Sequence, residues 1–300
     1  MNAAVHPESG AFVDLSTRTK LRVTGGDRLR YLNGQISNDL RKASPTTAIH
    51  ACVLNAKGRI NADVFLAPDG DSFLIDSDPE MRELLAARLE RYVIADDVQI
   101  EDVTEQFALF HVLGGGAGFD EQRSLAAARY GLAGRDIWVA AAQHEIVKQQ
   151  MHALVPLCDG AAEEAFRIER GVPRWGRELT EEIIPTEADL ESSAIDYAKG
   201  CYIGQEVISR IKMSGQTNKR LCGLITTSDV PLRHGMRLLT ADADAKDVGW
   251  VTSSTMSARL GTQIALGFLK RGYQDVGTAL SASAEGTEPV RVEVAALPFV

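Results

Sequence analysis

The sequence predicts an α+β protein of two or three packed units that ends in a small antiparallel β-barrel. Three observations support this prediction. The chain has 300 residues, which is more than one hydrophobic core usually serves. Helix-like and strand-like segments are mixed over 1–212 without strict alternation, which favours an α+β region. From 216 to 300, short strand-like runs follow one another closely.

Strand patterns dominate the N-terminal part, around one short helix. The helix begins after Asp27, which can cap it, and stops at Gly34. Residues with β-branched or aromatic side chains, bounded by turn-forming residues, predict strands at 11–16, 20–25, 48–55, 60–67 and 72–76.

The clearest helical pattern follows Asp78. Pro79 suits the first turn, where its missing N–H costs nothing, and apolar residues recur at helical spacing as far as Tyr92. The glycine-rich run 112–119 fits only two positions of a dinucleotide fingerprint, because the third is Phe119, so it predicts a turn. The remaining predictions are strands at 98–104, 107–114 and 136–141, and helices at 120–130, 144–154 and 161–170.

The C-terminal strand-like runs are broken by Gly, Pro, Asp and Ser. Val290, Val292 and Val294 alternate with charged residues, which predicts a strand with one buried face. We therefore expect a barrel domain at 216–300, a first region at 1–212, and the stretch 213–220 as the linker.

Composition argues against several classes of function. A net charge of -9 is unfavourable for a broad nucleic-acid surface, which needs clustered Lys and Arg. No apolar run approaches the roughly 20 residues of a membrane-spanning helix. The N-terminus shows no export signal, so a cytoplasmic location is expected. The six histidines and four cysteines show no metal-ligand spacing, so no metal site is predicted.

A polar and aromatic segment follows the helix predicted at 161–170. Glu169 can accept two N–H bonds from the edge of an amino-pyrimidine, and Trp175 can offer a flat face to a heterocycle. Arg174 and Arg177 can meet a carboxylate. Helix capping and solvated charge would explain much of the same segment, so a ligand pocket is one of two interpretations.

Cys201 lies in the polar, glycine-rich string AKGCYIGQE at 198–206. Gly200 and Gly204 permit unusual backbone angles and close approach, and Lys199 carries an ammonium that favours a nearby thiolate. The residues alone leave open a reactive or ligand-facing thiol and a structural one. The other cysteines are predicted to be small buried hydrophobes: Cys52, Cys158 and Cys222.

The string KGCYIGQE at 199–206 resembles the signature of the folate-binding YgfZ family, relatives of the glycine-cleavage T-protein, an aminomethyltransferase. The segments 14–40, 54–66 and 167–191 resemble further blocks of that family. The resemblance implies a GcvT-like ring of three subdomains. Two are mixed α/β units, with the inner one at about 46–104, and the third is the C-terminal antiparallel β-barrel.

The same resemblance implies a function. Tetrahydrofolate or a derivative would bind in a central channel, and the protein would help to assemble or maintain iron–sulfur proteins, including tRNA-modifying enzymes. Its expected partners are therefore folate and iron–sulfur client proteins. The functional thiol and lysine map onto Cys201 and Lys199, and the pterin-contacting glutamate maps onto Glu169. The further predicted folate-binding residues are Asn38, Trp175, Arg177, Gln205, Glu206 and Arg210.

One departure bears on catalysis. Aminomethyltransferases carry adjacent aspartates on the strand of the second block, where this chain has Asn61, Ala62 and Asp63. The simplest alignment puts the catalytic position on Ala62 and Asp63 on the opposite side of the strand. An accessory factor for iron–sulfur proteins is therefore favoured over a classical enzyme. The alternatives are a tetrahydrofolate-dependent one-carbon transferase, which a one-residue slip of the alignment would restore, and a non-catalytic scaffold.

Overall fold

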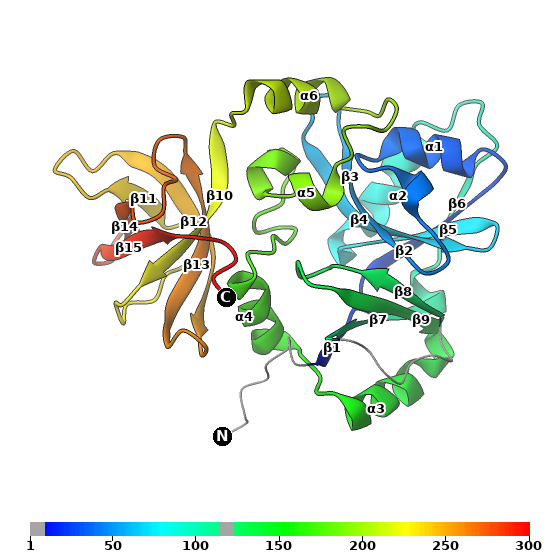
Figure 1. Ribbon diagram of the computed structural model, residues 1–300, viewed down its shortest axis with the longest axis horizontal. Helices are drawn as coiled ribbons and strands as arrows, with labels where there is room; N and C mark the ends of the chain where they lie inside the picture. Colours follow the sequence, from blue (N-terminus) through cyan, green and yellow to red (C-terminus); the bar gives the residue numbers. More distant parts are fainter. Residues whose placement is uncertain (1–9, 115–122) are drawn as a thin grey trace. The chain divides into compact units, whose positions relative to one another are not determined.

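The computed structural model describes residues 10–114 and 123–300 (Figure 1). They fall into two compact units. The first contains 10–159 and Leu190–Arg210, and the second contains Gly160–Asp189 and Ile211–Val300. The segment that carries Cys201 thus returns to the first unit after the chain has entered the second.

A five-stranded antiparallel sheet forms one part of the first unit, with strand order β3-β4-β5-β2-β6. The hydroxyl of Tyr31 in α1 donates to the carbonyl of Leu89 in α2, which joins the two helices of this part. Its elements are β2 (Thr19–Thr24), α1 (Arg28–Gln35), β3 (Ile49–Leu54), β4 (Ile60–Asp69), β5 (Ser72–Ser77), α2 (Arg82–Glu90) and β6 (Gln99–Asp102).

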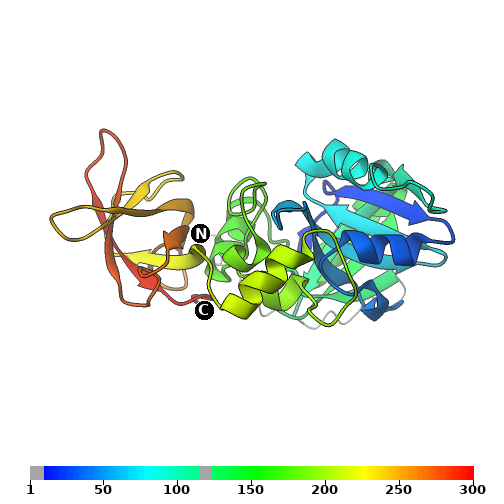
Figure 2. The ribbon, with the colours of Figure 1, turned by 90° about the horizontal axis from the view of Figure 1, so that it is seen from above.

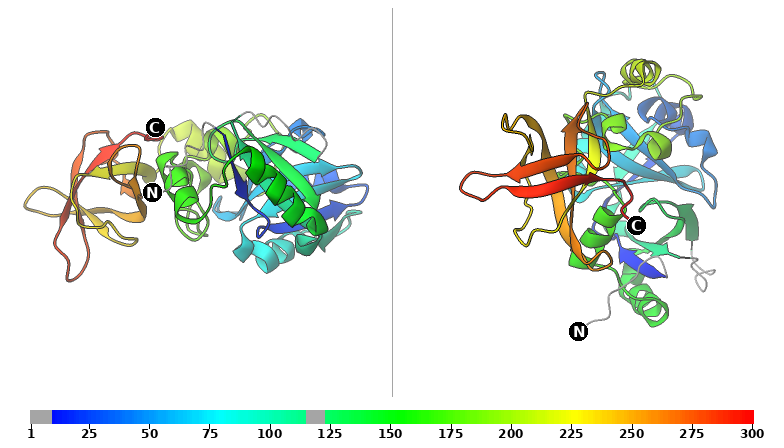
Figure 3. Two further views of the ribbon diagram at one scale, coloured as in Figure 1. Left: turned by 90° about the horizontal axis from the view of Figure 1, so that it is seen from below. Right: turned by 60° about the vertical axis from the view of Figure 1, so that its left-hand side comes forward.

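A four-stranded antiparallel sheet with order β1-β7-β9-β8 forms the other part. Helix α3 lies along this sheet (Figure 3). It packs Val147 and Met151 against Phe12, Phe110 and Ile137. The elements are β1 (Ala11–Asp14), β7 (Phe107–Leu113), β8 (Arg123–Ala127), β9 (Gly134–Ala140) and α3 (His144–Leu154).

The helix predicted at 120–130 is wrong where the structure describes that stretch. Residues Arg123–Ala127 form strand β8, paired with β9. Leu125 and Ala127 are buried while Ala126 is exposed, so the burial has the period of a strand. A short apolar run does not distinguish helix from strand, and pairing with β9 decides it here. Residues 115–122, including most of the glycine-rich run, lie outside the described residues.

The second unit contains a closed antiparallel barrel, whose strands are coloured yellow to red in Figure 2. The strand order is β10-β13-β12-β11-β14-β15. Val290, Val292 and Val294 are buried as predicted. Strand β14 was not predicted, because its sequence ALSAS holds few β-branched or aromatic residues. The strands are β10 (Lys219–Thr226), β11 (Arg237–Thr240), β12 (Asp247–Ser257), β13 (Thr262–Lys270), β14 (Ala279–Ser283) and β15 (Val290–Ala295).

Three further helices position the candidate site. They are α4 (Gly160–Glu169), α5 (Glu191–Ala194) and α6 (Gln205–Ser214). Because α6 reaches Ser214 and β10 begins at Lys219, the connection at 215–218 is shorter than the predicted linker. Short 3-10 turns occur at Leu40–Lys42, Pro79–Met81, Thr104–Gln106, Ala141–Gln143 and Pro185–Ala188. Among 10–114 and 123–300, no helix is long and apolar enough to cross a membrane.

Candidate functional site

Cys201 is exposed, whereas Cys52, Cys158 and Cys222 are buried as predicted. It lies in the loop between α5 and α6, which belongs to the first unit. An exposed thiol can meet a ligand or another protein, and the buried ones cannot. The geometry of this loop therefore decides how the thiol is presented.

Lys199 anchors the loop on one side of Cys201. Its ammonium nitrogen donates to the carbonyl oxygens of Asn33, Ile36 and Asn38 at 2.7, 2.7 and 2.6 Å. These carbonyls lie at and just beyond the C-terminal end of α1, where carbonyl groups lack helical partners and the helix dipole favours a cation. All three ammonium protons are thus used inside the protein, and the Lys199 side chain fastens the loop to α1.

The charge of Lys199 is balanced by its surroundings. Burial lowers the pKa of Lys199 to about 8, while the carboxylates of Asp39 and Asp196 oppose this shift. Asp196 also accepts from the Ala198 N–H at 2.7 Å and pairs with Lys42 at 2.6 Å. The ammonium therefore keeps its charge at neutral pH. The hydrogen bond from Ala198 to Asp196 is a second contact that orders the start of the loop.

Two glycines anchor the loop on the other side of Cys201. Gly204 has φ +86°, and a Cβ there would lie 2.6 Å from the Asn55 carbonyl oxygen. Gly58 has φ +73°, and its Cβ would lie 2.9 Å from Cβ of Val207. Only glycine fits such angles and contacts, so the β3–β4 turn packs directly on the start of α6. Cys201 is consequently held between two fixed points.

The other predicted residues of the first unit are largely engaged. Asn38 donates to the carbonyl oxygens of His50 and Ser193 at 2.8 and 3.2 Å. Glu206 and Arg210 pair with each other at 2.8 Å on the exposed surface of α6, and Gln205 begins that helix. These contacts order the surroundings of Cys201, and their role in folate binding stays a prediction.

Asp63 stands on β4 with its side chain largely buried. Ala62 is 1% exposed and burial alternates over the first five residues of β4, 60–64, so the two side chains point to opposite faces as predicted. His50 Nε2 lies 2.7 Å from Asp63 Oδ1. Burial alone would raise the pKa of Asp63, but His50 and the guanidinium groups of Arg18 and Arg129 outweigh it and lower that pKa. Asp63 is therefore a carboxylate at neutral pH.

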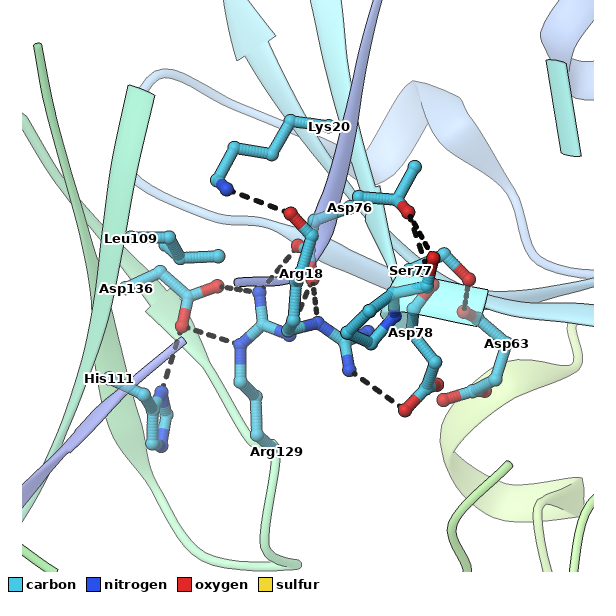
Figure 4. Close-up of polar contacts among 12 residues, drawn as sticks. Arg18, Lys20, Asp63, Asp76, Ser77, Asp78, Leu109, His111, Arg129 and Asp136 are labelled. Atoms are coloured by element: carbon cyan, nitrogen blue, oxygen red, sulfur yellow. Dashed lines mark hydrogen bonds and ion pairs between the residues drawn. The ribbon is translucent and has the colours of Figure 1, made fainter. Parts of the chain in front are cut away.

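A buried ionic network joins the two sheets of the first unit, and sequence analysis missed it (Figure 4). Arg129 donates to Asp76 of β5 at 3.0 and 2.6 Å and to Asp136 of β9 at 2.8 and 2.7 Å. His111 Nδ1 lies 2.8 Å from Asp136, and Arg18 Nε lies 2.5 Å from Asp76. Burial raises the pKa of Asp136, but Arg129 and His111 lower it to about 2 overall. The charges are paired, as burial requires.

Phe65 connects this network to Asp63. The Arg129 guanidinium lies 4.0 Å from the centroid of the Phe65 ring, and the His50 ring stacks on that ring at 4.4 Å and 5°. The Arg129 guanidinium and the His50 ring cannot both occupy the same face of the Phe65 ring at these distances, so the Phe65 ring lies between them. The ionic network thus supports the position of the His50–Asp63 pair.

Glu169, Trp175 and Arg177 belong to the second unit. Glu169 is 9% exposed, and one of its carboxylate oxygens accepts from Ser257 at 2.5 Å. Trp175 is half-buried and Arg177 is exposed. Arg174 pairs with Glu163 and Glu164 of α4, so its charge is used within the protein rather than kept for a ligand carboxylate.

A second buried ion pair shapes this segment and was also missed. Arg167 is 1% exposed and donates to Glu178 at 3.1 Å and to Ser253 at 2.7 Å. Glu178 also accepts from the Arg174 N–H at 3.0 Å. The pair thereby fixes the turn that carries Trp175 and Arg177. In the described parts of the chain, no group of three His, Cys, Asp or Glu side chains is placed to hold a metal ion.

Two family profiles match the chain. The GCVT N-terminal domain matches residues 3–118, and the glycine cleavage T-protein C-terminal barrel domain matches residues 219–300. The chain belongs to the GcvT-like proteins. The crystal structure of glycine cleavage system aminomethyltransferase T from Bartonella henselae has a TM-score of 0.85 and 18% identity, covering 97% of this chain and 86% of that one. The predicted α+β GcvT-like fold with its antiparallel barrel is confirmed.

Relatives of this GcvT-like chain include proteins named as aminomethyltransferases and proteins named as iron-sulfur cluster assembly factors. An aminomethyltransferase of Saccharopolyspora erythraea is 27% identical over 99% of this chain and 88% of its own length. An iron-sulfur cluster assembly factor IBA57 homolog, mitochondrial, of Pyricularia oryzae is 28% identical over 71% of this chain. The match spans 57% of that relative's length. A similar homolog of Dictyostelium discoideum is 26% identical over 70% of this chain. The finer resemblance to the YgfZ family stays a prediction.

Proposed function

We propose that this protein is a tetrahydrofolate-binding accessory factor for the assembly or maintenance of iron–sulfur proteins, including tRNA-modifying enzymes. Cys201 is its functional thiol. The observation that carries the proposal is the presentation of that thiol. Of the four cysteines only Cys201 is exposed, and its loop is fastened at Lys199 and at Gly204.

Such a loop suits a thiol that meets a partner repeatedly. A fixed loop loses little conformational freedom on binding, so more of the contact energy stabilises the complex. The relatives named as iron-sulfur cluster assembly factors support the choice of client class. The cluster is cargo in this proposal and not a resident group of the chain.

The described residues fit a folate. Glu169 keeps one carboxylate oxygen that has no partner among the described residues, and this oxygen can accept an N–H from a pterin edge. Trp175 is half-buried and offers an aromatic face. Bound tetrahydrofolate would supply one-carbon chemistry. The role of the chain would be to orient the pterin with Glu169 and to present Cys201.

The first test is rescue of iron–sulfur enzyme activity in a strain that lacks the gene. Cys201→Ala should fail to rescue while retaining the unfolding transition of the parent protein, because an exposed side chain contributes little to stability. Cys222→Ala removes a buried thiol instead and serves as the matched control that should still rescue. Full rescue by Cys201→Ala would refute the proposed role of the thiol.

The folate part is tested by anaerobic calorimetric titration with tetrahydrofolate. Glu169→Ala should weaken binding about tenfold or more, since it removes a hydrogen-bonding carboxylate from a largely buried position. Glu181→Ala, an exposed glutamate of the same unit, should bind like the parent protein. If the folded parent protein binds no tetrahydrofolate, a scaffold with a reactive thiol replaces the folate-binding factor.

A second candidate is aminomethyl transfer to tetrahydrofolate. The ionised Asp63 beside His50 favours it, because a partly accessible carboxylate can interact with a folate nitrogen. The aminomethyltransferase relative that covers almost the whole chain also supports it. The absence of a second adjacent aspartate counts against it. Multiple turnovers with an aminomethyl donor, lost in Asp63→Asn, would establish this activity.

A further inference from the structure

The β3–β4 turn at 55–59 carries two exposed cations, Lys57 and Arg59. Among the described residues, neither side chain has a hydrogen bond or an ion pair. Several other exposed cations of the same unit are ion-paired. Arg41, for example, pairs with Asp39 at 2.7 Å. The turn thus keeps two positive charges available to an outside group.

The backbone of this turn is fixed. The Asn55 side-chain oxygen accepts the N–H groups of Lys57 and Arg59 at 2.9 and 3.2 Å. The Asn55 N–H donates to the Arg59 carbonyl at 2.9 Å, and the Gly58 N–H donates to the Asn55 carbonyl at 2.9 Å. Both cations therefore project from a preorganised base, which reduces the entropy lost when they bind a partner.

The same turn borders the loop of the exposed thiol. A Cβ on Gly204 would lie 2.6 Å from the Asn55 carbonyl oxygen and 3.2 Å from the Gly58 Cα. Cys201 is three residues before Gly204, and three residues of extended chain span at most about 11 Å. The two free cations and the exposed thiol consequently lie within reach of one short peptide segment.

We propose that the turn carrying Lys57 and Arg59 is a docking surface for an acidic segment of the protein partner whose cysteine reaches Cys201. This inference rests on the proposed function, because that function makes Cys201 the meeting point. The chain has a net charge of -9, which repels acidic partners at a distance. Two uncompensated cations beside the thiol offset this repulsion locally and orient the partner, as complementary charge does at protein interfaces.

The test is thiol–disulfide exchange between purified full-length protein and synthetic peptides. Each peptide carries one cysteine as a mixed disulfide with 5-thio-2-nitrobenzoate, flanked by four glutamates, four glutamines or four lysines. The Cys201 thiolate attacks the peptide sulfur, a new disulfide forms, and the thionitrobenzoate anion leaves and is measured by its absorbance. The buried cysteines react slowly, and Cys201→Ala supplies the background rate.

The acidic peptide should react about tenfold faster than the lysine peptide at low ionic strength, and the difference should shrink as salt is added. Lys57→Glu with Arg59→Glu should abolish or invert the preference. The matched control, Arg233→Glu with Lys246→Glu, makes the same charge change at exposed barrel positions and should leave the preference intact.

Three outcomes would overturn the docking surface. The first is that the parent protein reacts equally fast with all three peptides. The second is that the barrel control loses the preference for the acidic peptide to the same extent as the variant of the turn. The third is that an RNA oligonucleotide or a poly-γ-glutamyl folate blocks exchange at lower concentration than the acidic peptide. These outcomes can be distinguished from a failure of the iron–sulfur role, since the exchange assay requires neither a cluster nor rescue of a strain. Failed rescue with an intact peptide preference would count against the iron–sulfur role and not against the surface.

Discussion

Replacement of Lys199 by methionine separates an anchoring role from a purely catalytic one. The variant keeps most of the side-chain volume and removes the ammonium that binds the carbonyls of Asn33, Ile36 and Asn38. If Lys199 were purely catalytic, its replacement would leave the free energy of unfolding unchanged. If Lys199 fastens the loop to the end of α1, its replacement lowers the free energy of unfolding.

The magnitude follows from two opposing contributions. Hydrogen bonds to a charged group contribute roughly 1.5–3 kcal/mol each, so three contribute several kcal/mol. Removal of the ammonium also relieves its desolvation cost, which is several kcal/mol for a buried ion. The three carbonyls left without a partner add to the loss. We expect Lys199→Met to lower the free energy of unfolding by about 2–4 kcal/mol.

Urea unfolding of the two proteins gives this difference, and amide hydrogen exchange over 196–206 shows where it arises. Exchange in this loop should accelerate more than exchange in the barrel. Lys57→Met is the matched control, because that lysine is exposed and its side chain has no partner among the described residues. A change below about 0.5 kcal/mol for Lys199→Met, or the same change in both variants, would refute the anchoring role.

Three further predictions concern the supports of the site. Gly204→Ala should destabilise the protein by about 1–3 kcal/mol in urea, through its positive φ and the contact with Asn55, whereas Gly200→Ala, which has open space around it, should cost less than 1 kcal/mol. Arg129→Met removes the guanidinium that pairs with both buried carboxylates of the network, Asp76 and Asp136, and should cost about 3–5 kcal/mol in the same assay, and a cost below 1 kcal/mol would contradict the network. The folded-state pKa of Asp136 lies below its usual value, so the unfolded chain binds more protons between pH 4 and 2. About 2 kcal/mol of stability should therefore disappear as pH falls through that window, with a shallower fall in Asp136→Asn.

Much of the local structure could be predicted from residue patterns. The alternation at 290–295 marks a strand with one buried face, and the apolar spacing after Pro79 marks a helix, because both depend on neighbours along the chain. The polar, glycine-rich residues around Cys201 left a ligand-facing and a structural thiol open, and the structure shows that Cys201 is the exposed one of the four cysteines. The stretch 123–127 shows the limit, since pairing with a distant strand overrides a short ambiguous pattern.

The sequence by itself therefore determined the fold class and the barrel, and it singled out Cys201 from the three buried cysteines. Only the tertiary structure decided that Cys201 is exposed and what surrounds it. Lys199 is 161 residues from Asn38 along the chain, and Arg129 is 53 residues from Asp76. Such pairs leave no periodic mark in the sequence, because they depend on which strands and helix ends the fold brings together. Burial then fixes their protonation and geometry, since a charge removed from water must find its partner inside the protein.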